Sequence, residues 1–391
     1  MLLIYTGLNE ITGSRKDCKP PVMVKEEEPT DSKSYGQRHL LRCPWGRETA
    51  PPGPTPITPG IQKTSIMNRS RRRSKFQNFL SEPYNLRETI GWLWRNVRGV
   101  QKSNFCGIRP LPQRSILNTI QARIKLGFLG DIMDMHQKSL LISPEVQEFL
   151  QPCDFMVGNF EATMTIARKP HLTAQVQNVS ILDSLARCFP PERTFLSLAN
   201  NHAGDFPAAV FRASLNILEQ RGFHAFGLVQ SPFVHITDRI RVVAASMWSN
   251  RPFPEIIPFE SLKRYCGKDD FNIAFPHWGY ELELFPRPAV VKTGQQLLQR
   301  YDAIIGHHSH VPQPLASLES GGTWKLTAFS LGDFCTGLRM RKYQFGIICR
   351  MDIGTGKDGL LQAGAVEWRY TKVSSSTSGT MKVSVVSDMP I

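Results

Sequence analysis

Three of the ten histidines in this chain fall within four positions, in the segment from Gly306 to His310. The apolar residues 303–305 come directly before them and predict a short buried strand that ends at Gly306. In extended backbone, side chains two positions apart project from the same side, so His308 and His310 are expected to point the same way. Neutral imidazole is the commonest metal ligand among protein side chains. The segment therefore predicts a clamp of two histidines, which needs further oxygen or nitrogen ligands from elsewhere in the chain.

Four other predicted strands also end in polar residues. These strands span residues 124–129, 155–157, 195–199 and 273–275. The polar residues that follow them are Asp131, Asn159, Glu161, Asn200, Asn201, His202 and His277. Each cluster alone has an ordinary interpretation as a turn, a helix cap or a structural histidine. Because α/β folds place their sites at the carboxyl ends of buried strands, five clusters with only nitrogen and oxygen donors predict a site for one or two divalent ions, such as Mn, Fe or Zn.

The elements that must position these residues alternate between strand and helix. Residues 207–221 begin with proline, carry a broad apolar face and are followed by Gly222, a pattern typical of a helix. Alternation of this kind predicts a layered α/β domain. From residue 324 the strand-like runs have no helices between them, so the domain is expected to close with antiparallel strands. We place this domain at residues 124–373 and a serine- and threonine-rich tail at 374–391.

Most of the positive charge lies in the first third of the chain. Residues 1–123 hold 21 Lys and Arg against 9 Asp and Glu, whereas residues 124–391 hold 26 against 24. Residues 1–66 are predicted to be a disordered, proline-rich segment, and Met67, just before an arginine-rich run, is a second candidate start. A basic extension, residues 67–123, follows. Such an arm favours acidic surfaces, nucleic acid or anionic lipid, but nucleic acid is not expected because the charge of the main domain is nearly balanced.

Residues 86–98 are predicted to form an amphipathic helix within this extension. Asn85 is suited to cap it, and Glu88 occupies the capping-box position. One apolar stripe runs along it, formed by Leu86, Ile90, Leu93, Trp94 and Val97. The stripe has two interpretations, a surface that binds a membrane or a partner and a face that packs on the main domain. Its width favours packing on the domain.

The expected location of the protein and the expected redox state of its cysteines rest on sequence features that are not seen. No apolar run approaches the roughly 20 residues of a membrane helix, and no secretory h-region follows Met1. A cytoplasmic protein is therefore the default expectation. The eight cysteines are scattered without a C-x-x-C pair, so we expect reduced residues used in packing.

The polar motifs, in their order along the chain, resemble those of a known family. They are Gly130-Asp131, Asn159-Phe160-Glu161, Ala199-Asn200-Asn201-His202, His277-Trp278-Gly279, the segment 306–311 and Ser330-Leu331-Gly332-Asp333-Phe334. This series is similar to that of the CapA-type capsule and poly-γ-glutamate synthesis proteins, within the calcineurin-like metallophosphoesterase superfamily. The resemblance covers about residues 124–350. It implies a four-layer α/β/β/α sandwich with a centre for one or two divalent metal ions at the edge of a sheet.

The resemblance also implies a role for each residue. The metal ligands would be Asp131, Asn159, Glu161, Asn201, His277, His308 and His310. His202 would be the general acid, with Asp205 as its catalytic partner. Residues that orient the ligands or the substrate would be His307, Glu281, Gln313 and Asp333.

Three positions depart from the patterns of these families. Met133 stands where simple metallophosphoesterases have a histidine, which the CapA-type pattern also lacks. His136 is close in sequence and could replace it, but an ordinary loop residue is the favoured interpretation. Pro207 stands where the CapA-type family tends to have glycine. Asp333 stands where that family tends to have asparagine, which adds a negative charge close to the centre.

Two functions are compatible with the resemblance. One is a metal-dependent hydrolase of an anionic ester or, through the link to polyglutamate, of an amide or a polymer end, with the surface-polymer machinery as partner. The other is a metal-binding assembly or export component that holds an anionic polymer without cleaving it, on a fold whose catalytic site is inactive. A membrane anchor would favour the second function, for which the family implies a membrane-associated or extracytoplasmic location.

Overall fold

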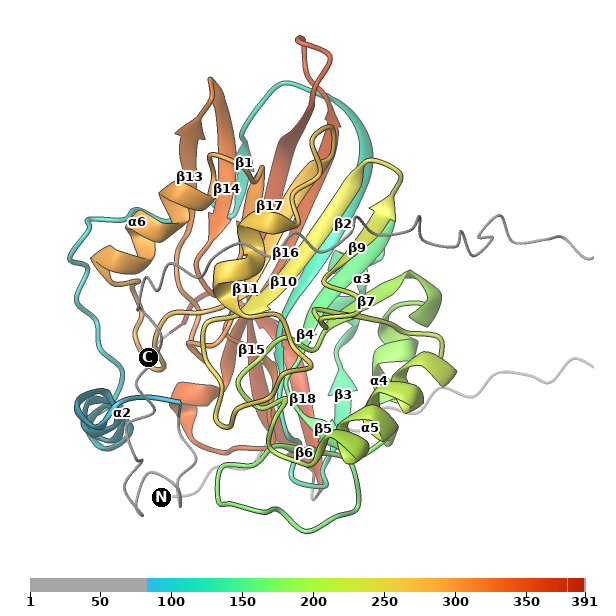
Figure 1. Cartoon of the computed structure of the whole chain (residues 1–391), viewed down its shortest axis with the longest axis vertical. Coiled ribbons are helices and arrows are strands. Elements are labelled where there is room, and N and C mark those ends of the chain that lie inside the picture. Colours follow the sequence, from blue (N-terminus) through green and yellow to red (C-terminus); the bar gives the residue numbers. More distant parts are fainter. Residues whose placement is uncertain (1–82, 378, 390–391) are drawn as a thin grey trace, which may run out of the picture. The chain divides into compact units, whose positions relative to one another are not determined.

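The computed structural model describes residues 83–377 and 379–389, all within the second of two units, Asn68–Ile391. The predicted disordered segment 1–66 and the arginine-rich run after Met67 lie outside the described residues. Two sheets pack face to face, with helices on both outer sides (Figure 1). This is the four-layer α/β/β/α arrangement expected from the sequence.

The larger sheet has ten strands in the order β3-β18-β17-β16-β2-β4-β7-β8, with β1 beside β17 and β15 beside β2. Its strands are β1 (Arg114–Ile116), β2 (Gln121–Ile132), β3 (Ser139–Ile142), β4 (Phe155–Phe160), β7 (Thr194–Ser197), β8 (His224–Phe226), β15 (Asp333–Cys335), β16 (Phe345–Thr355), β17 (Leu361–Thr377) and β18 (Thr380–Val386).

The smaller sheet has six strands in the order β13-β14-β12-β11-β10-β9. Its strands are β9 (Phe233–Thr237), β10 (Ile240–Ser246), β11 (Phe271–His277), β12 (Ala303–Ile305), β13 (Leu315–Ser320) and β14 (Thr323–Ala328), and a separate pair is formed by β5 (Thr163–Met164) and β6 (Val176–Gln177). The α-helices are α2 (Leu86–Arg98), α3 (Pro144–Leu150), α4 (Ser180–Cys188), α5 (Ala208–Gln220) and α6 (Pro288–Leu297). Short 3₁₀ turns are η1 (Pro191–Arg193), η2 (Phe259–Arg264) and η3 (Arg341–Tyr343).

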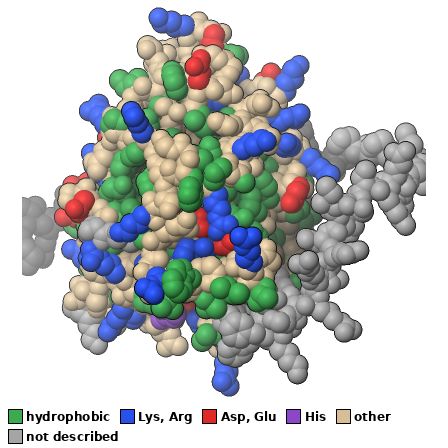
Figure 2. Space-filling model, turned by 90° about the vertical axis from the view of Figure 1, so that its left-hand side faces the viewer, with side chains coloured by type: hydrophobic (Ala, Val, Ile, Leu, Met, Phe, Trp, Pro, Cys, Tyr) green, Lys and Arg blue, Asp and Glu red, His purple; other side chains and the backbone are tan. Residues whose placement is uncertain are grey.

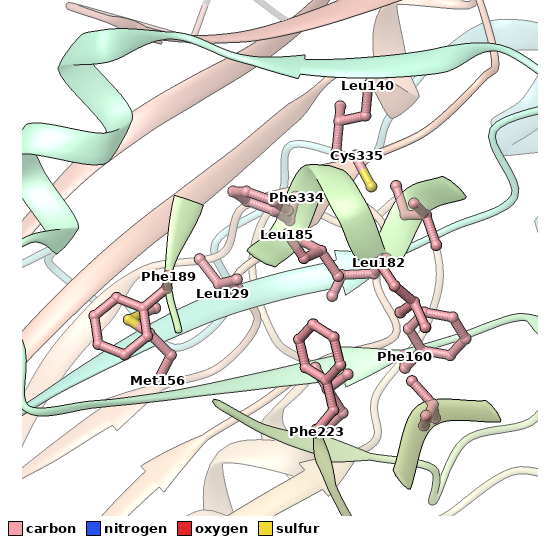
Figure 3. Close-up of a cluster of buried hydrophobic side chains, with 14 of the residues drawn as sticks. Leu129, Leu140, Met156, Phe160, Leu182, Leu185, Phe189, Phe223, Phe334 and Cys335 are labelled. Carbon is pink, nitrogen blue, oxygen red and sulfur yellow. The ribbon is translucent and has the colours of Figure 1, made fainter. Parts of the chain in front are cut away.

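Successive side chains of a strand point to opposite faces of the sheet, so the hydrophobic interior is divided into layers. Leu126 and Phe128 of β2 face the other sheet and pack in one cluster with Phe275 of β11. Leu129 faces the opposite way, into a cluster beneath the outer helices that also holds Leu185 of α4 (Figure 3). A third cluster lies between the smaller sheet and α6. Both faces of the central strands are therefore buried, which explains why the sequence of each strand is a continuous run of apolar residues.

Parallel pairing brings the ends of the predicted strands together. β2 pairs in parallel with β4, and β4 with β7, in the larger sheet. In the smaller sheet β10, β11 and β12 are also parallel neighbours. The five predicted strands correspond to β2, β4, β7, β11 and β12. Their polar ends therefore lie at the same edge of each sheet.

The sheet extends past the domain boundary expected from the sequence. Residue 373 lies inside β17, and β18 returns along it to pair with β3. Residues 380–386 are thus a strand between two others, and not part of a separate tail. The pairing joins segments more than 200 residues apart, so no local pattern could reveal it.

Helix α2 forms where it was predicted, and Asn85 Oδ1 accepts a hydrogen bond from the Glu88 N–H at 3.0 Å. The helix packs on the main domain, as favoured, but it does so with its polar face and not with its apolar stripe. Ile90 and Trp94 are each 59% exposed, whereas Arg95, on the polar face, is 6% exposed. The polar face packs on the domain because it finds buried acidic partners there. The part of the surface where α2 lies shows hydrophobic side chains among Lys and Arg (Figure 2).

Among the described helices, none combines the length and the apolar character needed to cross a bilayer.

Candidate metal centre

The candidate ligands lie at the junction of the two sheets. Asp131 is near the end of β2, Glu161 follows β4, and His277 is the last residue of β11. The short strand β15 pairs with β2 so that Asp333 lies opposite Asp131. Every residue that the sequence predicted as a metal ligand is at most 3% exposed. The fold therefore gathers these side chains in its interior.

The histidine segment does not have the extended backbone expected from the sequence. His308 and His310 have φ angles of 90° and 55°, in a region that residues other than glycine seldom adopt. Their rings still converge, with centroids 6.1 Å apart. The turn directs the His308 N–H at Asp131 Oδ2, 3.1 Å away. A strained turn, and not strand alternation, thus brings the two imidazoles together, as is common at functional sites.

Three overlapping groups of side chains have ligand atoms close enough to hold a metal ion. The groups are Glu161 with His277 and His308, Glu281 with His308 and His310, and Asp131 with His310 and Asp333. Within each group the ligand atoms lie within 4.8 Å of one another. Five of the predicted ligands belong to these groups.

The two predicted amide ligands lie beside these groups. Asn201 Oδ1 is 2.7 Å from His277 Nε2, and Asn159 Nδ2 donates to Asp131 Oδ1 at 2.8 Å. The same amide nitrogen is 3.2 Å from Glu161 Oε2. Asn201 thus directs an oxygen at the centre, whereas Asn159 directs its nitrogen there and bridges two carboxylates.

The electrostatics of the centre fit a divalent cation. Glu161 Oε1 and Asp333 Oδ2 are buried without a hydrogen-bond partner among the described residues. Burial raises the pKa of Asp333 to about 8 against the lowering effect of His310, and burial and the Asp131 charge hold the pKa of Glu161 well above its usual value. Burial lowers the pKa of His277 to about 3, so its imidazole is neutral. Unpaired carboxylate oxygens beside the neutral imidazole of His277 are donors of the kind that Mn, Fe or Zn binds.

His202 and Asp205 form a hydrogen-bonded pair at the side of the centre. His202 Nδ1 lies 2.7 Å from Asp205 Oδ2, and His202 Nε2 is 3.9 Å from Glu161 Oε1. Burial lowers the pKa of His202, but the Asp205 charge and hydrogen bond outweigh burial, so the pKa lies above its usual value. The ring can therefore carry a proton on the nitrogen that faces the centre.

The residues expected to orient ligands occupy different places. His307 Nδ1 is 3.1 Å from Asp131 Oδ1, beside a candidate ligand. Glu281 and Asp333 are members of the metal-capable groups themselves, so they are closer to the centre than expected. Gln313 donates its side-chain amide to Glu283 O at 2.7 Å and belongs to none of the groups formed by the described residues.

Among the described residues, no other ligand takes the place of the histidine that simple metallophosphoesterases have at the position of Met133. Met133 is buried at 3% exposure, and its backbone N–H donates to Cys335 O at 3.0 Å. His136 is exposed, with Nδ1 3.5 Å from Asp134 Oδ2. His136 is therefore an ordinary loop residue, as the sequence favoured.

Several residues at the centre were not found from the sequence. Tyr84 Oη is 2.7 Å from His308 Nε2, and Trp92 Nε1–H donates to Glu281 Oε2 at 2.6 Å. Asn250 accepts from Asn201 Nδ2 at 3.0 Å and lies 3.1 Å from His202 Nδ1. His171 Nε2 is 3.3 Å from Asp205 Oδ1. Only Asn250 carried a usable signal, because it closely follows the buried strand β10.

One family model matches part of this sequence. Residues 260–337 match the family described as "Bacterial capsule synthesis protein PGA_cap". The matched region contains the histidine segment, His277, Glu281 and Asp333. This finding supports the resemblance to CapA-type proteins that the motifs carry. No curated protein matches the chain.

Three solved structures are similar to this chain at low identity. A hypothetical protein from Thermus thermophilus is 13% identical, with a TM-score of 0.40, over 64% of this chain and 99% of that one. The calcineurin-like phosphoesterase YfkN from Bacillus subtilis is 10% identical, with a TM-score of 0.34, over 66% and 94%. Chaetomium thermophilum Vps29, in complex with a cyclic peptide, is 12% identical, with a TM-score of 0.26, over 68% and 98%.

Proposed function

We propose that this CapA-like chain is a metal-dependent hydrolase that acts on an anionic ester or on the end of an anionic polymer. The observation that carries the proposal is the position of His202. Its Nδ1 is bonded to Asp205, and its Nε2 faces Glu161, a member of one of the metal-capable groups. A tuned imidazole beside a cation site is an arrangement suited to general-acid catalysis of hydrolysis.

The roles of the residues follow from their contacts. The three metal-capable groups would hold one or two divalent ions, which supply a Lewis acid and an activated water when bound. His202 would donate the proton on Nε2 to the leaving group. Asp205 positions the ring and stabilises its charged form, as a carboxylate does in other histidine-dependent hydrolases. Asn250 and His171 flank this pair, because Asn250 Nδ2 donates to Asp205 Oδ1 at 3.4 Å and His171 Nε2 lies 3.3 Å from the same oxygen.

An anionic substrate is favoured by the metal ions that the centre would hold. The buried carboxylates of the centre repel anions by themselves, so the positive charge of bound ions would be needed to attract a phosphate or carboxylate group. The match to the capsule synthesis family makes a component of surface-polymer synthesis our choice of biological substrate or partner. Metal binding and anion binding are then linked, and substrate affinity should depend on metal concentration.

A non-catalytic metal-binding component of the same machinery is the second candidate. The burial of the centre favours it, because all the predicted ligands are at most 3% exposed and a substrate would need a path to them. Met133 favours it as well, because one ligand of the simple metallophosphoesterases is absent. The presence of the His202 and Asp205 pair favours the hydrolase.

The experiment is metal analysis by mass spectrometry on protein purified without chelator, with hydrolysis of bis-p-nitrophenyl phosphate measured on the same samples. We expect the wild type to contain metal and to cleave the diester, and His308→Ala to lose both. His235→Ala is the matched control, because that histidine is exposed and lies beside Asp270. Metal without hydrolysis of this or other esters would select the non-catalytic function. No metal in the wild type, even after addition of Mn or Zn, would refute both.

A further inference from the structure

Helix α2 and the residues just before it reach the metal centre from outside the region that matches the capsule synthesis family. Tyr84 is 3% exposed, and it contacts His308. Trp92, two turns further on, contacts Glu281. His308 and Glu281 are both members of one metal-capable group. The basic extension therefore touches two candidate ligands directly.

The geometry around His308 distinguishes its two ring nitrogens. Nδ1 lies 3.0 Å from His277 Nε2, toward the other candidate ligands. Nε2 lies 2.7 Å from Tyr84 Oη on the other side of the ring. The Tyr84 oxygen also accepts the Glu281 N–H at 3.2 Å. A hydroxyl oxygen has two lone pairs, so it can accept from both the Glu281 N–H and an Nε2–H.

We propose that Tyr84 is a positioning residue of the metal centre, which accepts a hydrogen bond from His308 Nε2–H and so presents Nδ1 to the metal. A histidine that binds a metal usually donates its other ring N–H to an oxygen, which fixes its tautomer and orientation. Tyr84 supplies that oxygen here. The inference rests on the proposed metal centre and assigns a part of it to the N-terminal extension.

Helix α2 is anchored strongly enough to hold Tyr84 in this place. Arg95 donates to Glu281 O at 2.7 Å and pairs with Glu283 at 3.2 Å. Arg287 joins Glu283 to Glu88 through ion pairs of 2.6 and 2.8 Å. Arg95 and Glu283 are largely buried, so breaking their ion pair would leave an uncompensated charge. The helix is thus fixed to the same loop that carries Glu281.

Aromatic packing around Tyr84 restricts its ring further. Tyr84 packs edge-on against Trp248 at 5.0 Å between centroids and stacks with Tyr280 at 6.1 Å. Trp248 also lies 6.2 Å from His308. The hydroxyl therefore has little freedom to leave the histidine, as a positioning role requires.

A different role would give the opposite result. If the metal used His308 Nε2, Tyr84 would compete with it, and removal of the hydroxyl would strengthen metal binding. If Tyr84 only packed the helix, removal of the hydroxyl would leave metal affinity unchanged. Metal affinity therefore separates the three roles.

The experiment compares Tyr84→Phe with the wild type by calorimetric titration of the chelator-treated full chain with Mn²⁺ and with Zn²⁺. We expect the Kd to rise by about 10- to 100-fold, the usual effect of removing such a hydrogen bond. Tyr280→Phe is the matched control in the same aromatic cluster and should bind like the wild type. The visible absorption of bound Co²⁺ is a second readout, and it should change in Tyr84→Phe because the imidazole loses its fixed orientation.

Trp92→Phe gives a second variant, which removes the hydrogen bond to Glu281 and should also weaken binding. Unchanged or tighter binding in Tyr84→Phe, with wild-type Co²⁺ absorption, would overturn the inference and leave the proposed function intact. Failure of the wild type to bind any of these ions would overturn the proposed function as well. Thermal unfolding of each variant without metal distinguishes loss of folding from loss of affinity.

Discussion

Replacement of Gly306 by alanine should destabilise the fold and displace the histidines of the metal centre, although Gly306 is not itself a candidate ligand. Gly306 follows β12 and leads into the histidine turn. A Cβ atom here would lie 2.1 Å from Phe329 O and 2.4 Å from Trp278 Nε1. Contacts this short do not occur, so the strand end must move by roughly 1 Å or Trp278 must leave its place. The position therefore accepts only glycine without rearrangement.

The cost can be worked from the contacts that the movement breaks. Trp278 Nε1–H donates to Phe329 O at 2.9 Å, and loss of this buried bond costs about 1–3 kcal/mol. Overpacking of the surrounding core adds about 1–3 kcal/mol. The free energy of unfolding should thus fall by about 2–6 kcal/mol, a large part of the stability of a typical domain. Gly306 is also hydrogen-bonded to Ala328 through its N–H and to Leu331 through its carbonyl, so its displacement carries into the histidines.

Urea unfolding followed by circular dichroism measures the loss, and metal analysis of the same protein measures the effect on the centre. Gly294→Ala is a matched control, because its Cβ would also face Trp278 and Phe329, but at 3.5 and 3.7 Å. This glycine lies in α6, where alanine should raise stability by about 0.5–1 kcal/mol. If Gly306→Ala unfolded at the same urea concentration as the wild type and kept its metal, the reasoning about this contact would be wrong.

Two further predictions concern groups beside the centre. In Asp205→Asn the pKa of His202 should fall, because the carboxylate raises that pKa against the effect of burial, and the hydrolysis rate of esters with poor leaving groups should drop at least about 100-fold. Hydrolysis of a p-nitrophenyl ester should be affected less, because its leaving group needs no proton from His202. An equal loss of rate on both substrates would contradict the role of His202. Burial raises the pKa of Glu88, but the hydrogen bonds from Arg287 and Arg95 outweigh burial and place it below 4.5. The stability that Glu88 contributes is then present above about pH 4.5 and is lost as the pH falls below that value. The difference in urea stability between the wild type and Glu88→Gln should therefore shrink in acid. A difference that stays constant with pH would count against the ion pairs.

The strand ends could be predicted because they are local features of the sequence. Each buried strand is a short apolar run, and the polar residues that follow, such as Asp131 and His277, stand out against it. Parallel pairing then brings them together without further information. The same reasoning would have found Asn250, had the run 240–246 been recognised as a strand.

The orientation of α2 could not be predicted in this way. Its hydrophobic pattern indicated the wrong face, because the partners of the polar face, Glu281 and Glu283, lie almost 200 residues further along the chain. Burial of Arg95 depends on the Glu281 backbone carbonyl and the Glu283 carboxylate as well as on Glu88 of the same helix. The positive φ angles of His308 and His310 also depend on tertiary contacts, here with the Asp131 carboxylate.

The overlap of the metal-capable groups limits which of them can be filled together. His308 belongs to two groups and His310 to two, so the group with Glu281 shares a member with each of the others. If each side chain gives one ligand atom, an ion in that middle group excludes ions from both outer groups. The outer groups share no residue and can be filled at once. The centre is thus a choice between one ion and two, and its stoichiometry should depend on how much metal is offered.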